Sequence, residues 1–371
     1  MSRLLGLLAL LMAFAQAANA AAACGALPAW HQWERFQEQM VSEQGRVVDQ
    51  SDPRQITTSE GQSYAMFFAL VNNDRVMFRR LLRWTESHLA QGDLTAHLPS
   101  WLWGQAEDGD WKVLDDNTAS DSNLWIAYSL LEAGRLWNEH GYTVLGTLLL
   151  QRMAREEVVL LPGFGHLLLP GKSGFVHDQV WRFNPSYLPP QLMARARHAL
   201  EVEPWVSLSG NTERLLMETS PHGVAPDWVS WVEGKGWKQR AADESVSSYD
   251  AIRVYLWVGM LHPEAPAAAA LKAHFKQAVR HFDAAGLPPE EMDIAGDRAS
   301  GVGPVGFSAA WLPLLDGTPL AQAQLSRLEK VATQPMGYYD SVLALFGLAW
   351  HGQRYQFDAT GRLIPAWTVC R

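Results

Sequence analysis

The chain has 371 residues, enough for one large domain with a sizeable core, and 48% of them are hydrophobic. It carries 30 lysines and arginines against 39 aspartates and glutamates, which gives a formal net charge of −9 at pH 7. An acidic chain without a basic run repels phosphate, so this composition argues against a nucleic-acid partner and against an anionic membrane surface.

The first 23 residues are typical of a secretory signal peptide. Arg3 gives a positive start, an apolar run follows at residues 4–14, and Ala18-Asn19-Ala20 is a small-residue cleavage site. The apolar run is too short to span a bilayer well. We therefore predict cleavage near residues 20–23, a periplasmic or secreted protein, and a single mature domain at residues 24–371.

The two cysteines, Cys24 and Cys370, stand at the two ends of the mature chain. An oxidising compartment permits two cysteines to pair, and the termini of a domain often lie close together. A disulfide that ties the two ends and a pair of independent thiols are therefore both open interpretations. A mass shift on reduction and alkylation distinguishes them.

After the signal segment, apolar residues recur at spacings of three and four, which is typical of helices with a broad buried face. Strand-like alternation is limited to short stretches such as residues 166–169 and 355–363. No low-complexity linker interrupts the chain. The predicted helical segments are residues 28–41, 64–89, 124–137, 142–159, 188–199, 211–218, 250–261, 266–285, 307–315, 321–333 and 338–350.

The turns that begin helices recur at a rough interval. Glu60, Asp121, Ser186 and Asp250 are separated by 61, 65 and 64 residues, and two more helix starts follow. A mature chain of about 348 residues divides into six units of about 58, each long enough for two helices. Six helical hairpins closed in a ring form an (α/α)6 barrel, so we predict an all-α fold of this kind with short β segments in its loops. Its inner helices run parallel, which would bring residues at their N-terminal ends together on one face.

Tryptophan is unusually frequent, with 17 in the chain. An indole ring can fill a core or serve as a flat platform for a sugar ring. We expect most of the 17 to be core and a minority to line a binding cleft. Trp101 and Trp103 are the candidate sugar platforms, because they, with Trp111, closely precede Asp121.

Glu60 lies at the start of a predicted helix. Ser59 and Gln62 have the spacing of a capping box that opens this helix. In a purely structural interpretation, Glu60 is an acid favoured in the first turn by the helix dipole. A catalytic role requires instead that Glu60 face a crowded acidic site.

Asp121 is also at a helix start, where it or Ser120 could serve as the cap. Asp115 and Asp116 add negative charge close by. Asp250 has Arg253 three residues later, a spacing at which the two form an ordinary surface pair or, within a site, an arginine that holds a base ionised and oriented. The residues alone support structural and catalytic interpretations of both aspartates equally.

The sequence shows no motif for a metal or a cofactor. The histidines, His222 and His351 among them, are scattered, and neither an HExxH nor a paired His/Cys spacing occurs. A nucleophile elbow and a glycine-rich phosphate loop are likewise missing. We predict that the protein uses no metal and no cofactor.

Three blocks around the acids resemble the motifs of glycoside hydrolase family 8. The segment ASDSNLWIAYSLLEA at residues 119–133 is similar to the family signature, and Ser59-Glu60-Gly61-Gln62-Ser63-Tyr64 and Tyr249-Asp250-Ala251-Ile252-Arg253 match two further blocks. More likeness lies in residues 98–104, 182–187 and 303–310, so it spans nearly the whole mature chain.

The resemblance implies an (α/α)6 glycoside hydrolase that cuts internal bonds of a β-1,4-glucan with inversion, and a link to bacterial cellulose biosynthesis. The implied partners are the glucan and, functionally, a cellulose synthase complex; we expect a monomer. Glu60 matches the proton donor and Asp250 the base that activates water. Asp121 matches the signature aspartate, which binds and distorts the sugar at the cleavage point. Tyr187 and Arg253 match residues that position the water and the carboxylate.

One position departs from the family pattern. The signature usually has a second acid two residues after the first, and here that position is Asn123. The change removes a charge beside the site and leaves the three proposed acids intact.

Several alternatives remain within this resemblance. Chitosan or xylan could be the substrate, although extra acids would suit the amino groups of chitosan and Asn123 argues mildly against it. A lyase that uses Tyr187 and Arg182 on a uronic acid would release an unsaturated, absorbing product. A glucan-binding accessory without catalysis would show no turnover, and the presence of all three acids counts against it.

Overall fold

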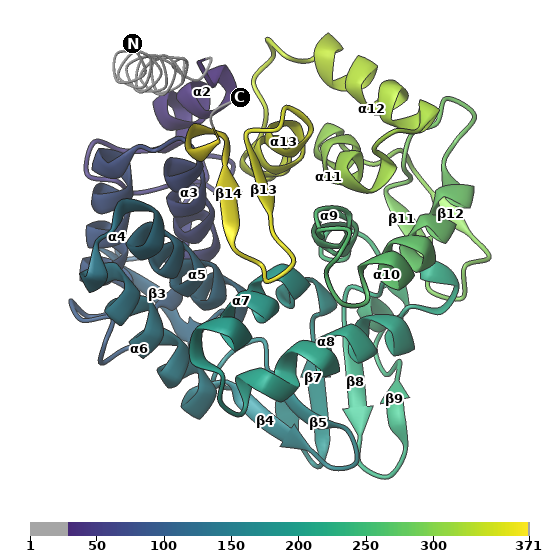
Figure 1. Ribbon diagram of the computed structural model, residues 1–371, viewed down its shortest axis with the longest axis horizontal. Coiled ribbons are helices and arrows are strands. Elements are labelled where there is room, and N and C mark those ends of the chain that lie inside the picture. Colours follow the sequence, from purple (N-terminus) through teal and green to yellow (C-terminus); the bar gives the residue numbers. More distant parts are fainter. Residues whose placement is uncertain (1–28, 370–371) are drawn as a thin grey trace, which may run out of the picture.

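The computed structural model describes residues 29–369. The predicted signal peptide at residues 1–23 and both cysteines, Cys24 and Cys370, lie outside the described residues, so the cleavage site stays a prediction and both interpretations of the cysteines stay open. Within residues 29–369, twelve α-helices form five hairpins and a sixth pair, made by the first and the last helix, and these close into a ring (Figure 1). The predicted (α/α)6 barrel is thereby confirmed.

Six helices form the inner ring, and at least half of the residues in each of them are buried. In the first of them 12 of 13 residues are buried, and in the second 16 of 18, as expected for helices surrounded by other helices. The inner helices are α3 (Ser59–Val71), α5 (Ser120–Trp137), α7 (Pro190–Leu200), α9 (Ile252–Gly259), α11 (Val305–Leu315) and α13 (Tyr338–His351).

The outer helices bury only one face. Six of 15 residues are buried in α4 and four of 17 in α6, so the rest of each helix meets solvent. Each outer helix packs on an inner one, and α2 completes the ring against α13 (Figure 1). The outer helices are α2 (His31–Met40), α4 (Arg75–Leu89), α6 (His140–Glu156), α8 (Trp205–Thr219), α10 (Ala268–Phe275) and α12 (Pro319–Lys330).

The prediction of one helical segment at residues 64–89 is wrong. The chain turns at Asn73, which has a left-handed backbone (φ 56°), and Asp74 then caps α4 by accepting a hydrogen bond from the Met77 amide at 2.9 Å. The predicted segment at residues 266–285 is also divided, because α10 ends at Phe275 and a 3₁₀ helix, η4 (Lys276–His281), follows.

Aromatic rings fill the centre of the barrel. Tyr64 from α3, Trp125 from α5, Trp257 from α9 and Phe346 from α13 contact one another with ring centroids 5.1–6.4 Å apart. All four are buried. The inside of the barrel is therefore a packed core, and a polar site can lie only at an end of it.

Short strands occupy the loops. Fourteen strands of the described chain form five small antiparallel sheets. The predicted strands at residues 166–169 and 355–363 overlap three of them, whereas the two longest strands, at residues 100–105 and 111–118, were not predicted. The strands are β1 (Thr57–Thr58), β2 (Ser100–Gln105), β3 (Trp111–Thr118), β4 (Val158–Leu161), β5 (Gly165–Leu168), β6 (Val176–His177), β7 (Val180–Phe183), β8 (Val229–Val232), β9 (Gly236–Lys238), β10 (Val246–Ser247), β11 (Glu291–Asp293), β12 (Ala299–Ser300), β13 (Tyr355–Phe357) and β14 (Leu363–Pro365).

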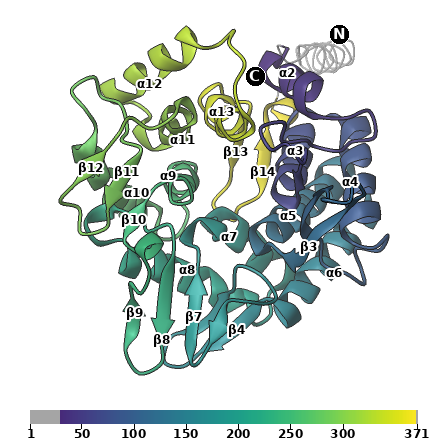
Figure 2. The same cartoon turned by 180° about the vertical axis from the view of Figure 1, so that it is seen from behind.

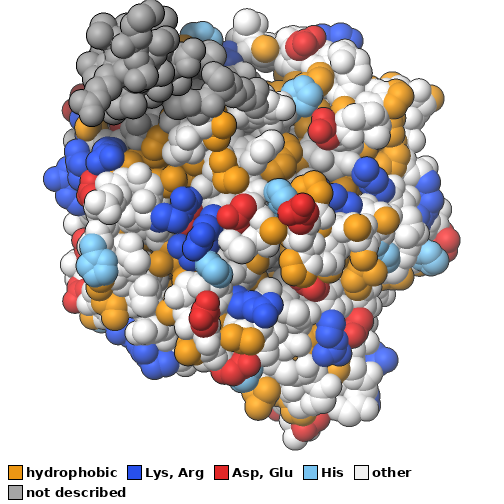
Figure 3. Space-filling view, in the orientation of Figure 1, with side chains coloured by type: hydrophobic (Ala, Val, Ile, Leu, Met, Phe, Trp, Pro, Cys, Tyr) orange, Lys and Arg blue, Asp and Glu red, His pale blue; other side chains and the backbone are white. Residues whose placement is uncertain are grey.

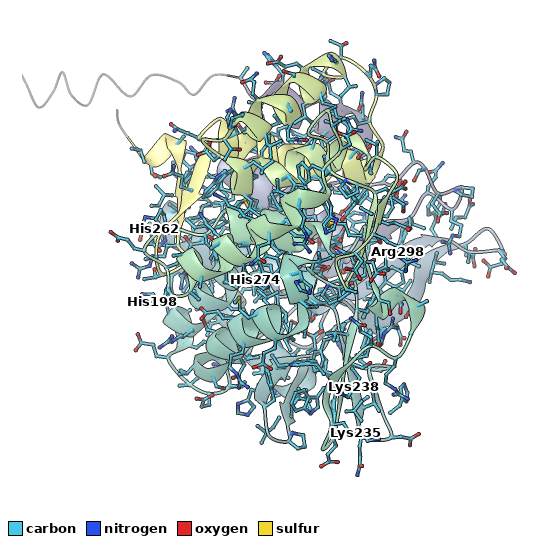
Figure 4. The ribbon with its side chains drawn as sticks, turned by 90° about the vertical axis from the view of Figure 1, so that its right-hand side faces the viewer. His198, Lys235, Lys238, His262, His274 and Arg298 are labelled. Atoms are coloured by element: carbon cyan, nitrogen blue, oxygen red, sulfur yellow. The ribbon has the colours of Figure 1, made fainter. Side chains whose placement is uncertain are left out.

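The barrel has two distinct ends. Strands β1 and β10 lead into the starts of α3 and α9, whereas the β13–β14 hairpin follows the end of α13. The hairpin lies in front in Figure 1, and Figure 2 shows the opposite end. In Figure 4, His198 and His262, at the ends of α7 and α9, lie on the opposite side of the molecule from Arg298 in the β11–β12 loop. We call the end at which α3 and α9 begin the helix-start end, and the end that carries the β13–β14 hairpin the helix-finish end.

No helix within residues 29–369 combines the length and the apolar character needed to cross a membrane.

Candidate active site

The three predicted acids meet at the helix-start end, around the guanidinium of Arg253. Its Nη1 donates a hydrogen bond to Glu60 Oε2, and its Nη2 donates one to Asp250 Oδ1 at 2.7 Å. Nη1 also lies 3.9 Å from Asp121 Oδ2. Residues 190 positions apart in the sequence thus share one cation, because the starts of α3, α5 and α9 converge.

Glu60 lies in the first turn of α3 and has no capping role. Thr58 is the cap, since its side chain accepts from the Gly61 amide at 3.1 Å. The predicted capping box of Ser59 and Gln62 is therefore wrong: the Gln62 side chain is buried and accepts instead from the Val47 amide. The Glu60 carboxylate binds Arg253 rather than a helix amide, and only 21% of this side chain is exposed.

A second group contacts Glu60. The hydroxyl of Tyr338, the first residue of α13, donates to Glu60 Oε1 at 3.1 Å. A tyrosine hydroxyl both donates and accepts, so it can bond to this carboxyl with or without its proton.

Asp121 is the most buried of the three acids, with 3% of its side chain exposed. Its Oδ1 accepts from the Ser122 amide at 2.7 Å. Burial raises the pKa of Asp121 to about 7 and the charge of Glu60 adds to the rise, whereas Arg253 and the hydrogen bonds of Ser122 oppose it. Near neutral pH this carboxyl therefore holds a proton part of the time.

Asp250 lies in the turn before α9 and is more open, with 33% of its side chain exposed. Its Oδ2 accepts from the indole Nε1 of Trp228 at 3.1 Å, and its Oδ1 accepts from Arg253. Asp227 fixes the turn, since its Oδ1 accepts from the amides of Ser248 and Ala251, each at 2.8 Å. Both partners of Asp250 can only donate, so each of its two oxygens accepts a hydrogen bond and the carboxyl group is fixed in orientation.

The guanidinium of Arg253, which binds the acids, packs over the ring of Tyr187. Arg253 is almost fully buried, and its guanidinium lies 5.6 Å from the centre of the Tyr187 ring. Tyr187 ends a 3₁₀ helix, η1 (Pro185–Tyr187), whose cap Asn184 accepts from the Ser186 amide at 3.0 Å. Burial raises the pKa of Tyr187 well above its ordinary value, so it is a neutral hydroxyl at working pH.

Comparison with known proteins decides the family. The family model described as "Glycosyl hydrolases family 8" matches residues 4–353. The chain belongs to glycosyl hydrolase family 8. A relative from Salmonella typhi named "Endoglucanase" is 52% identical over 336 residues, and one of the same name from Escherichia coli O157:H7 is 50% identical, with 90% of each chain covered in both cases. The solved structure of an endo-1,4-D-glucanase from Vibrio fischeri ES114 is 47% identical, with a TM-score of 0.88 over 92% of this chain and all of that one.

The tryptophans of this family 8 protein divide as expected. Eight of the 17 are buried and five more pack against the core. Of the other four, three lie on the β2–β3 hairpin, and the fourth is the indole bonded to Asp250. These four are Trp101, Trp103, Trp111 and Trp228.

The two predicted sugar platforms differ in their surroundings. The Trp103 ring is stacked against Trp111 at 5.2 Å, meets the edge of Trp84 at 5.4 Å, and has the Arg46 guanidinium 4.4 Å from its centre. Trp101, two residues earlier on β2, is half-buried. Trp111 is 43% exposed, the largest exposure among the 17 tryptophans. Trp103 is thus largely enclosed by neighbouring side chains.

Sequence reasoning missed three residues that hold the acids: Tyr338, Trp228 and Asp227. Tyr338 could have been found, because it begins an inner helix just as the acids do. Trp228 and Asp227 lie in an irregular segment whose position relative to Asp250 no local pattern reveals. Each acts by a hydrogen bond between segments that are far apart in the sequence.

Other parts of the described structure do not compete with this site. No group of three or more His, Cys, Asp or Glu in residues 29–369 could hold a metal ion. A cavity of about 410 Å³ lies at the helix-finish end, where His198 and His262 line it. It contains none of the predicted site residues.

Proposed function

We propose that this chain is an endo-1,4-β-glucanase that hydrolyses internal β-1,4 bonds of a cellulose-like glucan with inversion. The proposal rests on two carboxylates, Glu60 and Asp250, which accept hydrogen bonds from the two Nη atoms of Arg253. Two relatives named endoglucanase, at 50% and 52% identity over 90% of both chains, support the substrate class.

Glu60 is proposed as the proton donor. Its two oxygens accept hydrogen bonds from Tyr338 and Arg253, which fix the position of the carboxyl group. In the proposed reaction Glu60 gives a proton to the leaving oxygen and takes up another before the next turnover.

Asp250 is proposed as the base that activates water. The indole of Trp228 and the guanidinium of Arg253 each donate to one of its oxygens and fix its orientation, while a third of its side chain stays open to water. An inverting enzyme needs room for that water, so the two carboxyls should be about 6.5–9.5 Å apart when glucan is bound, rather than about 5–5.5 Å.

Asp121 is proposed to bind and distort the sugar at the cleavage point. Its carboxyl is buried beside the Arg253 guanidinium, so a sugar hydroxyl that reaches it would lose its water shell. Positive charge develops on the sugar ring in the transition state, and a neighbouring carboxylate stabilises that charge. Tyr187 and Arg253 would keep the water and the carboxylates in position.

Indole rings near the acids are proposed as platforms for other sugar units. Trp101, which is half-buried, and Trp111, which is exposed, have ring surface available on the β2–β3 hairpin. The enclosed ring of Trp103 supports Trp111 and would add to the platform through it.

Product analysis of cello-oligosaccharides by anomeric NMR tests bond, substrate and stereochemistry together. Inversion at a β bond makes the α-anomer appear first. A β-anomer appearing first would overturn the inverting mechanism, and no turnover would favour a non-catalytic glucan-binding accessory. Faster cleavage of chitosan or xylan than of cello-oligosaccharides would favour those alternative substrates.

Two variants test the assigned roles. Glu60→Gln and Asp250→Asn should each lower kcat on carboxymethylcellulose by about 10²–10⁴-fold, the usual contribution of a general acid or base. Glu34→Gln is the matched control, because Glu34 is an exposed glutamate on the outer helix α2. Full activity of Glu60→Gln would contradict the donor role.

The setting of the enzyme is proposed as well. The predicted signal peptide supports a periplasmic or secreted enzyme, and the family resemblance supports a functional association with a bacterial cellulose synthase complex. We expect a monomer. Light scattering of the purified protein and fractionation of the producing cells check the oligomeric state and the location.

A further inference from the structure

A buried acid that the mechanism does not use lies next to Asp121. Glu157 follows the last residue of α6, and none of its surface is exposed. Its backbone is fixed, since its amide donates to Met153 O and its carbonyl accepts from the Leu169 amide, both at 2.8 Å. The carboxyl is therefore held in place inside the protein.

Glu157 and its neighbour Asn123 each have one buried oxygen that accepts no hydrogen bond from the described residues. Glu157 Oε1 accepts from Thr118 Oγ1 at 2.5 Å and from Asn123 Nδ2 at 2.8 Å. Glu157 Oε2 and Asn123 Oδ1 are both buried, and neither has a hydrogen-bond partner among the described residues. An ionised carboxylate and an amide oxygen can only accept, so an ionised Glu157 leaves both atoms unsatisfied.

One proton on the Glu157 carboxyl would satisfy both of these oxygen atoms. A carboxylic acid has one donor and one acceptor, and so does the edge of a primary amide. A proton on Glu157 Oε2 can be donated to Asn123 Oδ1 while Asn123 Nδ2 donates back to Oε1. Burial also raises the pKa of Glu157 to about 8; the hydrogen bonds from Thr118 and Asn123 lower it, and the charges of Glu156 and Asp121 raise it.

We propose that Glu157 is a positioning residue: a neutral carboxylic acid that pairs with the side-chain amide of Asn123 and holds the turn that carries Asp121. This inference rests on the proposed role of Asp121. Its partners stand on either side of that turn, because Thr118 ends β3 and Asn123 lies in the first turn of α5. The same turn is also tied by the Ser120 amide, which donates to Pro170 O at 2.9 Å.

The pairing gives a physical reason for the departure from the family signature. Position 123 carries an amide in place of the acid of the signature, and the acid that meets this amide is Glu157, directly after α6. A neutral Glu157 adds no negative charge beside Asp121. An ionised carboxylate at either position would add one.

An exchange of the two groups tests the proposal. Glu157→Gln keeps a donor and an acceptor on the same edge, so kcat and Tm should change little, with kcat within about twofold. Asn123→Asp places two acids face to face and should lower kcat at pH 7 at least about tenfold, since small misplacements of a catalytic group cost up to 10²-fold. The double variant Asn123→Asp/Glu157→Gln restores an acid–amide pair and should recover most of that loss.

A spectroscopic measurement on the full chain gives an independent readout. The infrared C=O band of a protonated carboxylic acid should be present in the wild type at neutral pH and weaker in Glu157→Gln. The matched control is Glu132→Gln, which removes another fully buried glutamate; this one is paired with Arg195 and Arg135 and should not contribute to that band.

Three results would overturn the proposal: an unchanged band in Glu157→Gln, a loss of kcat in Glu157→Gln as large as in Asn123→Asp, or a double variant no better than Asn123→Asp. Each leaves the proposed function untouched, because that depends on wild-type turnover of β-1,4-glucan and on the loss of turnover in Glu60→Gln.

Discussion

At the helix-start end of the barrel three carboxylates share one arginine, while at the helix-finish end two arginines hold one carboxylate. Glu132, near the end of α5, is fully buried and accepts from Arg195 Nε at 2.6 Å, from Arg135, and from the Leu363 amide at 2.8 Å. These bonds connect α5 to α7 and to β14. Figure 3 shows this face, with basic and acidic side chains side by side near its centre.

The difference follows the direction of the inner helices. Helix starts carry partial positive charge and helix ends partial negative charge, so an excess of carboxylates suits one end and an excess of arginines suits the other. The bonds around Glu132 satisfy its carboxylate fully. Around Arg253 negative charge is in excess, and the raised pKa of Asp121 reflects both its burial and that excess. We infer that the ion pairs at the helix-finish end stabilise the fold. The crowded carboxyls at the helix-start end lower the free energy of unfolding and provide the reactive groups.

The largest effect on stability is expected from Arg195→Met. Removal of one partner of a buried ion pair leaves an uncompensated charge and typically costs about 3–5 kcal/mol. Urea unfolding should show a loss of this size, while kcat at a temperature where the variant stays folded should be close to wild type. A loss below about 1 kcal/mol would mean that Arg135 and the Leu363 amide hold Glu132 without it.

The corresponding change at the other end is Arg253→Met. Without the shared cation the carboxylates of Glu60 and Asp250 lose their common anchor, so kcat on carboxymethylcellulose should fall at least about a hundredfold, equivalent to about 2.7 kcal/mol. Steady-state kinetics on folded protein measure this. Arg195→Met is the control, since it removes a buried arginine that is remote from the acids. Equal losses of activity in the two variants would erase the distinction between the ends.

Asp121→Asn should stabilise the protein in a pH-dependent way while it lowers activity. The pKa of Asp121 in the folded protein is about 7, above the ordinary 3.8. The stability that its protonated form provides is complete below about pH 3.8 and is lost as the pH rises through about 7. An asparagine does not ionise, so the Tm of the variant should exceed that of the wild type by a few degrees above pH 7, and by less near pH 4. A difference in Tm that stays constant from pH 4 to 8 would contradict this origin.

The smallest effect is expected for Glu139→Ala, within the helix-finish end itself. Glu139 pairs with Arg75 at 3.1 Å, but both side chains are about 40% exposed. Exposed pairs contribute about 0.2–1 kcal/mol, so the urea midpoint should hardly move. A cost as large as that of Arg195→Met would show that burial does not set the strength of the ion pairs at this end.

The sequence predicted the ring and the convergence of the acids because both depend on local patterns repeated along the chain. A helix start is a local feature, and a barrel of parallel inner helices brings six such starts to one end. Glu60, Asp121 and Asp250 could therefore be chosen without a structure, and the family motifs then assigned roles that remain to be tested.

What the sequence did not predict depends on contacts between distant segments. Tyr338 reaches Glu60 across 278 residues, and Glu157 reaches Asn123 across 34. The predicted capping box does not form, because the Gln62 side chain accepts from the Val47 amide in the segment before α3. Thr58 caps the helix instead. The enclosure of Trp103 likewise depends on Trp84 and Arg46, which come from other elements.

The ring is closed by the two ends of the described chain, since α13 packs against both α2 and α3. The last inner helix also supplies Tyr338 to Glu60. The same helix places Phe346 against Tyr64, Trp125 and Trp257 in the centre of the barrel. The last inner helix therefore joins the packing of the core to the geometry of the site, so a loss of α13 would remove both a core ring and a hydrogen bond to Glu60.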